Sequence, residues 1–176
     1  PNLDVYRPAD IVETAECWEL ALKDATGPSV LALTRQNLPQ LRTEKSENLS
    51  AKGAYRLVAA TAERKVVLIA TGSEVEIAVA ARKLLADKGV RARVVSVPSL
   101  ELLLEQDEAS KAAIIGEAPI KIAVEAAVRF GWDAVVGADG GFVGMSSFGA
   151  SGPYKEVYKH FGIRTGAVRF VLHVTV

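Results

Sequence analysis

The spacing of hydrophobic residues near the start of the chain predicts one amphipathic helix. Apolar and small residues recur at intervals of three and four, the period of one helix face, at Ile11, Ala15, Trp18, Leu22 and Ala25. Asp10 followed by Glu13 resembles a capping box, and Gly27-Pro28 ends the pattern because proline cannot continue a helix. We therefore expect a helix over residues 11–25 with this stripe as its apolar face.

A short strand and a polar stretch follow this helix. The run Ser29 to Thr34 is typical of a buried strand. Since one helix and one strand cannot bury each other fully, we expect this segment to be the end of a domain whose larger part is missing. Thr43 to Gly53 is charged and small in composition, which indicates a linker. The chain begins at Pro1 rather than a methionine, so we expect a fragment of a longer protein.

From about Tyr55 onward, strand and helix patterns alternate, as in a parallel α/β sheet. Lys65 to Ala70 is apolar after its first residue, which is expected where helices cover both faces of a sheet. Ser73 and Glu76 form a capping box for the next helix. The other predicted elements are a helix with Ile77, Ala81, Leu84 and Leu85 on one face, strands at 92–97, 121–125 and, more weakly, 134–137, and helices at 100–115 and 154–161. The expected fold is α/β: a small doubly wound, mostly parallel sheet with helices on both faces.

Composition and charge exclude several classes of protein. Apolar residues make up 49% of the 176 residues, enough for a sizeable core, and 21 basic residues balance 21 acidic ones. This balance gives no indication of nucleic acid or an anionic membrane as partner. The longest apolar runs fall short of the roughly 20 residues that cross a bilayer, and no secretion leader is visible. Cys17 is the only cysteine, which rules out an intrachain disulfide and a cysteine zinc site and fits a reducing cytoplasm.

Two segments could bind an anion, but each has a simpler interpretation. The turn Thr71 to Glu74 joins a predicted strand to a helix, where backbone N–H groups can hold an anion. Ser73 is, however, sufficiently explained as a helix cap. The glycine-rich stretch Gly137 to Gly152 could cradle phosphate, but it contains no lysine or arginine. Phe148 and the other apolar side chains of this stretch favour packing of the loop against the sheet or a partner subunit.

Four polar residues are candidates for chemistry: Arg35, Glu125, His160 and His173. Arg35 lies just past a predicted strand, and its guanidinium could grip a phosphate or carboxylate at two points. On pattern alone, pairing with a nearby acid is the favoured role. The two histidines lack ligand spacing and are interpreted as structural or surface residues, and Glu125 has no identifiable partner. The pattern therefore predicts no catalytic residue, no cofactor-binding residue and no metal ligand in this chain.

Ordered motifs up to about Ile163 resemble the transketolase family. The segments similar to the end of the family's pyrimidine-binding domain are Arg7 to Asp10, the helix with Trp18, and Leu31 to Pro39. The segments similar to its C-terminal domain, in family order, are Ala70 to Ala81, Arg93 to Ser99, Val124 to Ala127 and Gly144 to Pro153. The resemblance divides the chain into the end of the pyrimidine-binding domain (1–42), a linker (43–54) and the transketolase C-terminal domain (55–176).

The resemblance implies an enzyme of the pentose phosphate pathway. Transketolases are cytoplasmic homodimers that transfer a two-carbon ketol unit from a ketose phosphate to an aldose phosphate, with thiamine diphosphate and magnesium. The family's cofactor ligands lie upstream of Pro1, so this chain alone is expected to bind no cofactor, to be inactive and to have a structural or dimer-contact role. The arginine of the family's SRQ or TRQ segment binds the sugar phosphate. Arg35, in Thr34-Arg35-Gln36, matches it and is the expected substrate phosphate-binding residue.

The tail and the function each leave an alternative open. Residues from Arg164 to Val176 depart from the family's terminal helix, because Gly166 and the β-branched residues disfavour a helix and Val171 to Val176 is strand-like. The alternative function is an autonomous small-molecule or nucleotide-binding α/β domain that uses the Thr71 to Glu74 turn. A third hypothesis, a purely structural dimerisation module, is compatible with a fragment of the enzyme.

Overall fold

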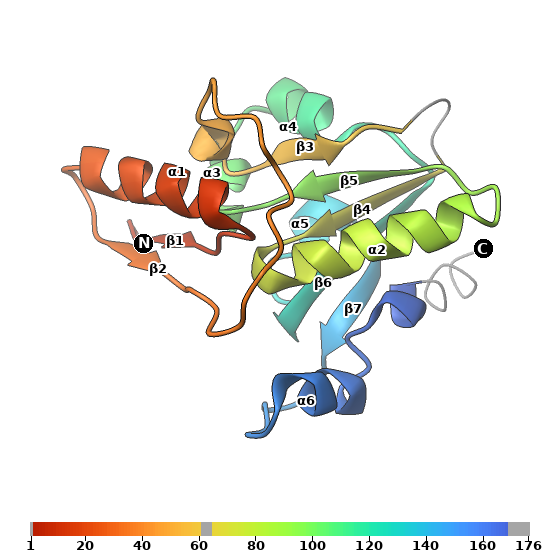
Figure 1. Ribbon diagram of the computed structural model, residues 1–176. Helices are drawn as coiled ribbons and strands as arrows, with labels where there is room; N and C mark the ends of the chain where they lie inside the picture. Colours follow the sequence, from red (N-terminus) through yellow and green to blue (C-terminus); the bar gives the residue numbers. More distant parts are fainter. Residues whose placement is uncertain (1, 61–64, 169–176) are drawn as a thin grey trace.

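The chain forms two sheets of unequal size (Figure 1). The structure is a computed structural model that describes residues 2–60 and 65–168. The elements of the N-terminal part are β1 (Asp4–Tyr6), α1 (Ile11–Lys23), β2 (Ser29–Leu31) and the 3-10 helix η1 (Leu49–Lys52). The elements that follow are β3 (Tyr55–Val58), β4 (Val66–Ala70), η2 (Gly72–Glu74), α2 (Val75–Ala86), β5 (Ala92–Ser96), α3 (Leu100–Glu105), α4 (Glu108–Ile115), β6 (Ile120–Val128), α5 (Asp133–Val136), β7 (Gly141–Met145) and α6 (Tyr154–His160).

The larger sheet has the strand order β3-β5-β4-β6-β7 and is parallel except for its edge strand β3. Every residue of the central strand β4 is buried, which explains the continuous apolar run. From β4 the chain continues to β5 on one side and later to β6 on the other. The carboxyl ends of β4 and β6 therefore form a topological switch point, where ligands bind in sheets of this kind.

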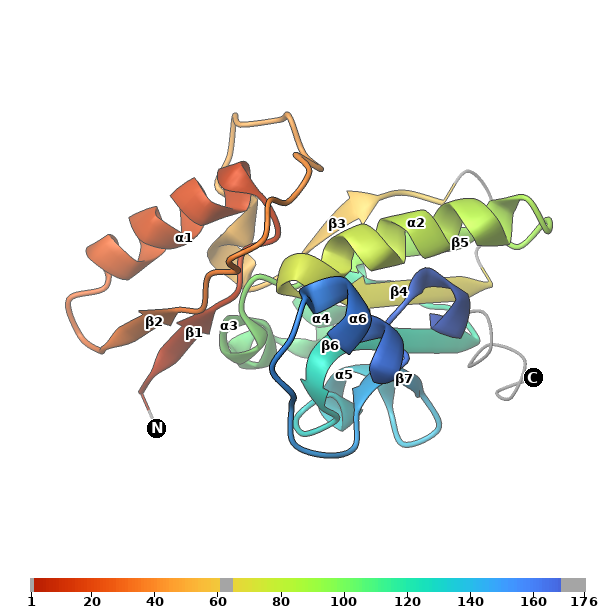
Figure 2. The same cartoon turned by 60° about the horizontal axis from the view of Figure 1, so that its bottom comes forward.

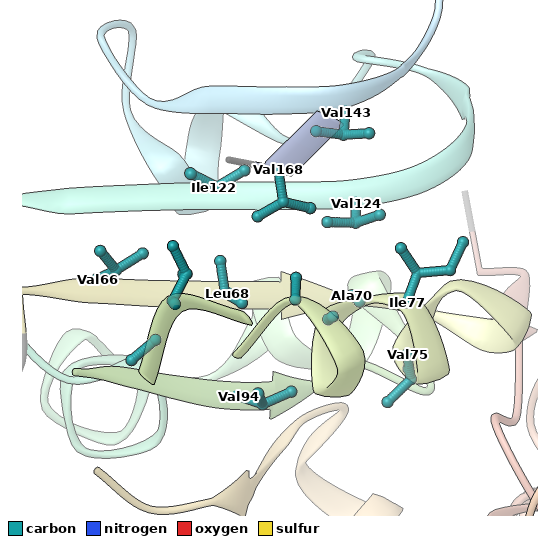
Figure 3. Close-up of a cluster of buried hydrophobic side chains, with 14 of the residues drawn as sticks. Val66, Leu68, Ala70, Val75, Ile77, Val94, Ile122, Val124, Val143 and Val168 are labelled. Carbon is teal, nitrogen blue, oxygen red and sulfur yellow. The ribbon is translucent and has the colours of Figure 1, made fainter. Parts of the chain in front are cut away.

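Helices cover both faces of this sheet, which confirms the predicted doubly wound α/β fold. On one face, α2 packs against every second residue of the strands. Figure 3 labels these residues: Val66, Leu68, Ala70, Val94, Ile122, Val124 and Val143. On the other face, Val67 and Ile69 pack against α3, α4 and α5. Because neighbouring residues of a strand point to opposite faces, one apolar run supplies two cores.

The strand predicted at 134–137 is wrong. These residues lie in or beside the short helix α5, and the strand is instead β7, within the glycine-rich stretch that was predicted as a loop. Trp132, Val135 and Val136 are all buried in the second core, and their spacing of three and four places them on one side of a helical turn. Phe148 is 97% exposed in this chain, so it does not pack against the sheet, and its packing against a partner subunit stays a prediction.

The single helix predicted over 100–115 is two helices, α3 and α4. The chain leaves the helical conformation at Gln106, and the Asp107 carboxylate then accepts a hydrogen bond from the Ser110 backbone N–H (2.8 Å). Aspartate is a preferred N-cap residue, so Asp107 starts a new helix where the apolar pattern alone continues.

The smaller sheet is a βαβ unit in which β1 and β2 pair in parallel around α1. The strand predicted at 29–34 is shorter than expected, and β1 was not predicted because three residues give too little pattern. As predicted, the Asp10 carboxylate caps α1, since it accepts from the N–H groups of Val12 (3.0 Å) and Glu13 (2.9 Å). Figure 1 shows this unit beside the carboxyl ends of β4 and β5.

The apolar stripe predicted for α1 faces solvent. Ile11 is 72% exposed and Leu22 is 77% exposed, while Trp18 is half exposed. The buried residues of the helix are Val12, Glu13, Glu16 and Cys17. Two of these four buried side chains are carboxylates, and Glu13 is the one that reaches the larger sheet.

The predictions for the tail are only partly covered by the described residues. Residues 165–168 are helical, although Gly166 was expected to disfavour a helix, and Val168 is buried in the first core. Burial of that side chain offsets the low helix propensity of glycine. The strand-like run Val171 to Val176 and His173 lie outside the described residues.

Candidate functional site

Arg7 lies at the switch point of the larger sheet. Its backbone N–H donates to the Pro98 carbonyl after β5 (2.7 Å), and its own carbonyl accepts from the Gly72 N–H after β4 (3.0 Å). The guanidinium donates from Nη2 to Glu74 (3.3 Å) and from Nη1 to Glu125. A side chain from the N-terminal part therefore occupies part of the crevice in which doubly wound sheets bind ligands.

Glu74 is the buried centre of this network. Its side chain is 0% exposed, and its Oε1 accepts hydrogen bonds from the hydroxyls of Ser73 and Tyr158. Its Oε2 accepts from the Ala126 N–H (3.1 Å) and from Arg7. The bond from Tyr158 joins α6 to the residue before α2. Figure 2 shows the ribbon of α6 beside the start of α2. Burial and the neighbouring Glu74 raise the pKa of Tyr158, which keeps this hydroxyl a neutral donor.

Two predictions for this region are wrong. Ser73 does not cap α2, because the residue before the helix is Glu74 and its side chain makes no capping bond; Ser73 donates to Glu74 instead. Glu125 lies inside β6 and has two partners, since it also accepts from the Trp132 indole N–H (2.6 Å). The Arg7 partner is 118 residues away in sequence, so no local pattern could reveal it.

Glu13 joins α1 to the larger sheet. Its Oε1 accepts from the Tyr55 hydroxyl of β3 (2.7 Å) and the Ser96 hydroxyl of β5 (2.5 Å), and its Oε2 accepts from the Ala9 N–H (2.6 Å). The side chain is buried, and burial raises the pKa of this carboxyl against the opposing effect of the three hydrogen bonds. Burial likewise raises the pKa of the nearby Cys17 thiol to about 12, so this thiol is protonated at neutral pH.

Glu16 attaches the segment that was predicted as a linker. Its carboxylate pairs with Arg42 and accepts from the N–H groups of Leu49 (3.2 Å) and Ser50 (3.2 Å) and from the Ser50 hydroxyl (2.7 Å). The Arg42 guanidinium also stacks 4.8 Å from the centroid of the Tyr55 ring. Glu16 thus holds this segment against α1 at Arg42 and again at Leu49 and Ser50.

Arg35 lies on the exposed loop after β2. It lines an open hollow of about 560 Å³ together with Gln36, Asn37, Gly152 and Tyr154. The acid pairing that the sequence pattern favoured is absent: within the described residues, Arg35 forms no ion pair or hydrogen bond. An exposed guanidinium with free donors is suited to binding an anion.

A second hollow, of about 380 Å³, adjoins the Arg7 network. It is lined by Arg7, Glu125 and Trp132 and by apolar side chains that include Leu100 and the exposed Phe130. Arg7, Glu125 and Trp132 already bind one another, so their polar groups are less available to a ligand in this hollow.

Metal and membrane sites were also sought in residues 2–60 and 65–168. In these ranges, no three His, Cys, Asp or Glu side chains are close enough to hold a metal ion. His160 is exposed at the end of α6, with its ring 4.9 Å from that of Phe161. None of the helices in the same ranges is long and apolar enough to cross a membrane.

The matches to known proteins lead to one family. Residues 53–164 match the family described as "Transketolase-like TK C-terminal domain". The transketolase of Sinorhizobium medicae is 58% identical over 165 residues, which are 93% of this chain and 24% of that protein. The transketolase of Cereibacter sphaeroides is 52% identical over 169 residues, which are 96% of this chain and 25% of that protein.

Solved structures agree with these sequence matches. A transketolase from Leishmania mexicana superposes with a TM-score of 0.87 at 40% identity over 99% of this chain and 25% of its own. A Pichia stipitis transketolase in complex with sedoheptulose 7-phosphate gives 0.86 at 38% identity over 96% of this chain and 24% of its own. The chain thus spans about a quarter of the length of the relatives it matches. It belongs to the transketolase family, through that family's C-terminal domain.

Proposed function

We propose that this chain is the C-terminal part of a transketolase in which Arg35 binds the phosphate of the sugar substrates. The full-length enzyme transfers a two-carbon ketol unit from a ketose phosphate to an aldose phosphate, in the pentose phosphate pathway. The observation that carries the proposal is the unpaired guanidinium of Arg35 in an open hollow. One relative was solved with sedoheptulose 7-phosphate, a substrate of this chemical class.

The loop around Arg35 supports this role by holding its neighbours in place. The Gln36 backbone N–H donates to the Thr34 hydroxyl (3.2 Å), and this hydroxyl donates to the Gln36 side-chain carbonyl. These bonds form a compact turn across the arginine. Arg35 therefore presents its donors to solvent from a fixed backbone, which reduces the entropy lost when a phosphate binds.

The cofactor of the proposed enzyme does not fit the described residues of this chain. Thiamine diphosphate, held through magnesium, supplies the carbanion chemistry of ketol transfer. Among residues 2–60 and 65–168, no three His, Cys, Asp or Glu side chains are close enough together to hold a metal ion. As the resemblance to the family implies, we assign the cofactor to parts of the full-length enzyme other than this chain, and we propose that the chain by itself is inactive and has a structural or dimer-contact role.

The proposal includes a division of the chain and a setting. Residues 1–42 are the end of the pyrimidine-binding domain, residues 43–54 connect the domains, and residues 55–176 are the C-terminal domain. The enzyme is a cytoplasmic homodimer that acts on sugar phosphates and has neither nucleic acid nor membrane as partner.

The alternative, an autonomous nucleotide-binding domain that uses the turn after β4, is less well supported. Gly72 has a φ of +56° in this turn, and its N–H is bound to the Arg7 carbonyl. The Arg7 guanidinium pairs with Glu74 and Glu125 in the neighbouring crevice. A nucleotide would have to displace a cation that neutralises two carboxylates, which is unfavourable for a partly buried network.

The test compares Arg35→Ala and Arg35→Lys in the full-length enzyme. Charge-assisted hydrogen bonds to phosphate contribute enough that Arg35→Ala is expected to raise KM for phosphorylated substrates by about 10-fold to 100-fold. Arg35→Lys keeps the charge but loses the two-point grip, so it is expected to have a smaller effect. KM for a non-phosphorylated ketose serves as the control and is expected to stay constant. An unchanged KM for the phosphorylated substrate in Arg35→Ala would contradict the proposal.

The chain itself gives a second, independent test. Calorimetric titration with thiamine diphosphate and magnesium is expected to show no binding, and a ketol-transfer assay no turnover. Binding or turnover by the isolated chain would overturn the assignment of the cofactor site to other parts of the enzyme.

A further inference from the structure

We propose that the C-terminal domain contributes directly to the sugar phosphate site, through the hydroxyl of Tyr154. This inference rests on the proposed role of Arg35, because it assigns a second binding residue to the same site. It gives the C-terminal domain a part in substrate binding, beyond a structural or dimer-contact role.

The hollow at Arg35 is built from two distant parts of the sequence. Arg35, Gln36 and Asn37 come from the loop after β2, whereas Gly152 and Tyr154 come from the start of α6. A neighbouring hollow of about 350 Å³ lies between the same loop and the turn after β4, lined by Leu33 and Thr34 on one side and Gly72 and Ser73 on the other. The arginine loop therefore lies along the seam between the two parts of the molecule, and Arg35 and Tyr154 line the same hollow.

Tyr154 has a free hydroxyl on a ring that is held in place. The ring packs edge-to-face against Tyr158, with centroids 6.0 Å apart and an angle of 87°, and the Lys155 ammonium lies 5.9 Å from its centroid. Tyr158 is anchored in turn by its bond to Glu74. Within the described residues, no hydrogen bond engages the Tyr154 hydroxyl, and the side chain is 38% exposed.

The chemistry of a phosphate monoester explains why a second donor is useful. A phosphate dianion has three terminal oxygens that accept hydrogen bonds, and one planar guanidinium satisfies two of them at a time. A phenol hydroxyl is an uncharged donor that meets the remaining oxygen without adding a cation to the hollow. The network of Arg7, Glu74 and Tyr158 positions α6 and therefore positions this donor.

The experiment uses Tyr154→Phe in the full-length enzyme, because this variant removes the hydroxyl and keeps the ring. KM for phosphorylated substrates is expected to rise by about threefold to tenfold, with kcat unchanged and KM for a non-phosphorylated ketose unchanged. Phe148→Ala is the control, since Phe148 is exposed in the segment just before α6 and does not line the hollow. KM of this variant for phosphorylated substrates is expected to stay unchanged. On the isolated chain, NMR titration with inorganic phosphate is expected to shift the amide signals around residues 35 and 154 together.

The outcomes separate this inference from the proposal on which it rests. If Arg35→Ala raises KM and Tyr154→Phe does not, the C-terminal domain has no part in phosphate binding and only the inference fails. An equal rise for phosphorylated and non-phosphorylated substrates in Tyr154→Phe also overturns it. If Arg35→Ala itself has no effect on KM, the phosphate site is elsewhere and both statements fail.

Discussion

The five-stranded sheet and the β1–α1–β2 unit are buried by different kinds of side chain. The sheet is closed on both faces by apolar residues, with the side chains of β4 wholly buried between helices. The smaller unit is attached through carboxylates, chiefly Glu13 and Glu16, and through the Arg7 guanidinium. Its apolar residues Ile11 and Leu22 remain exposed.

The two kinds of contact have different roles: apolar burial stabilises the sheet, and the carboxylate contacts fix the position of the β1–α1–β2 unit beside it. Apolar burial is non-directional and tolerates small shifts, so it stabilises the sheet without fixing one orientation of a neighbouring part. Buried carboxylates need donors at defined positions, and an imperfect fit leaves costly unpaired groups. The carboxylate seam therefore sets where the loop with Arg35 lies relative to α6, which is the geometry that the proposed phosphate site requires.

The largest effect is expected from a cavity in the sheet core. Leu68→Ala removes a fully buried side chain between β4 and α2 and is expected to lower the free energy of unfolding by about 2–5 kcal/mol. Chemical denaturation followed by circular dichroism measures this change. A loss below about 1 kcal/mol would mean that the core is not close-packed, and the contrast between the two regions would disappear.

A smaller effect is expected from the seam at Arg7. Arg7→Ala leaves Glu74 with three hydrogen-bond donors but no cation, and it removes one of the two partners of Glu125. We expect a loss of about 1–3 kcal/mol in the free energy of unfolding, because hydrogen bonds to charged groups are lost at a partly buried site. In the full-length enzyme the same variant is expected to disturb Arg35 and Tyr154 together.

The control for this variant is Lys23→Ala, which removes a cation whose side chain pairs with Glu19 on the exposed surface of α1. An exposed ion pair contributes little, about 0–1 kcal/mol. Equal losses in the two variants would contradict the assignment of Arg7 as the structural cation of the switch point.

The pH dependence of stability tests Glu13. Because burial raises its pKa above the ordinary 4.5, the folded protein binds this proton more tightly than the unfolded chain does. Its contribution to the free energy of unfolding is therefore most favourable below pH 4.5 and falls as pH rises through the folded pKa. The difference between wild type and Glu13→Gln, measured by denaturation at several pH values, is expected to decrease over this window.

Glu19→Gln provides a control of opposite sign on the same helix. Hydrogen bonds from Lys23 and Asn48 lower the pKa of the exposed Glu19, so its contribution is present above pH 4.5 and is lost as pH falls through the lowered pKa. A difference curve for Glu13→Gln that rises with pH would show that the folded protein stabilises the ionised carboxyl.

The sequence predicted β4, β5 and β6 because their signals are local, whereas β3 was not predicted and β7 was misplaced at 134–137. The apolar run of β4 and the capping of α1 by Asp10 depend on residues a few positions apart, and both were confirmed. The Arg7 network and the partners of Glu13 could not be predicted, since Ser96 is 83 residues from Glu13 in sequence. The acids at 10, 13 and 16 do share one helix face at intervals of three, a signal that could have indicated a buried polar face.

The orientation of α1 is the point at which hydrophobic periodicity misled, and it gives the smallest predicted effect. Leu22→Ala truncates an apolar side chain that is 77% exposed, so the free energy of unfolding is expected to change by no more than about 0.5 kcal/mol. Val12→Ala, on the buried face of the same helix, is expected to cost about 1–2.5 kcal/mol, since Val12 is 8% exposed. Replacing valine by alanine gains more helix propensity than replacing leucine does, so propensity opposes the expected order and a larger loss at Val12 reports burial. Denaturation of the two variants in parallel measures this difference. A larger loss for Leu22→Ala than for Val12→Ala would show that the apolar stripe, and not the face with Val12, is the buried side of α1.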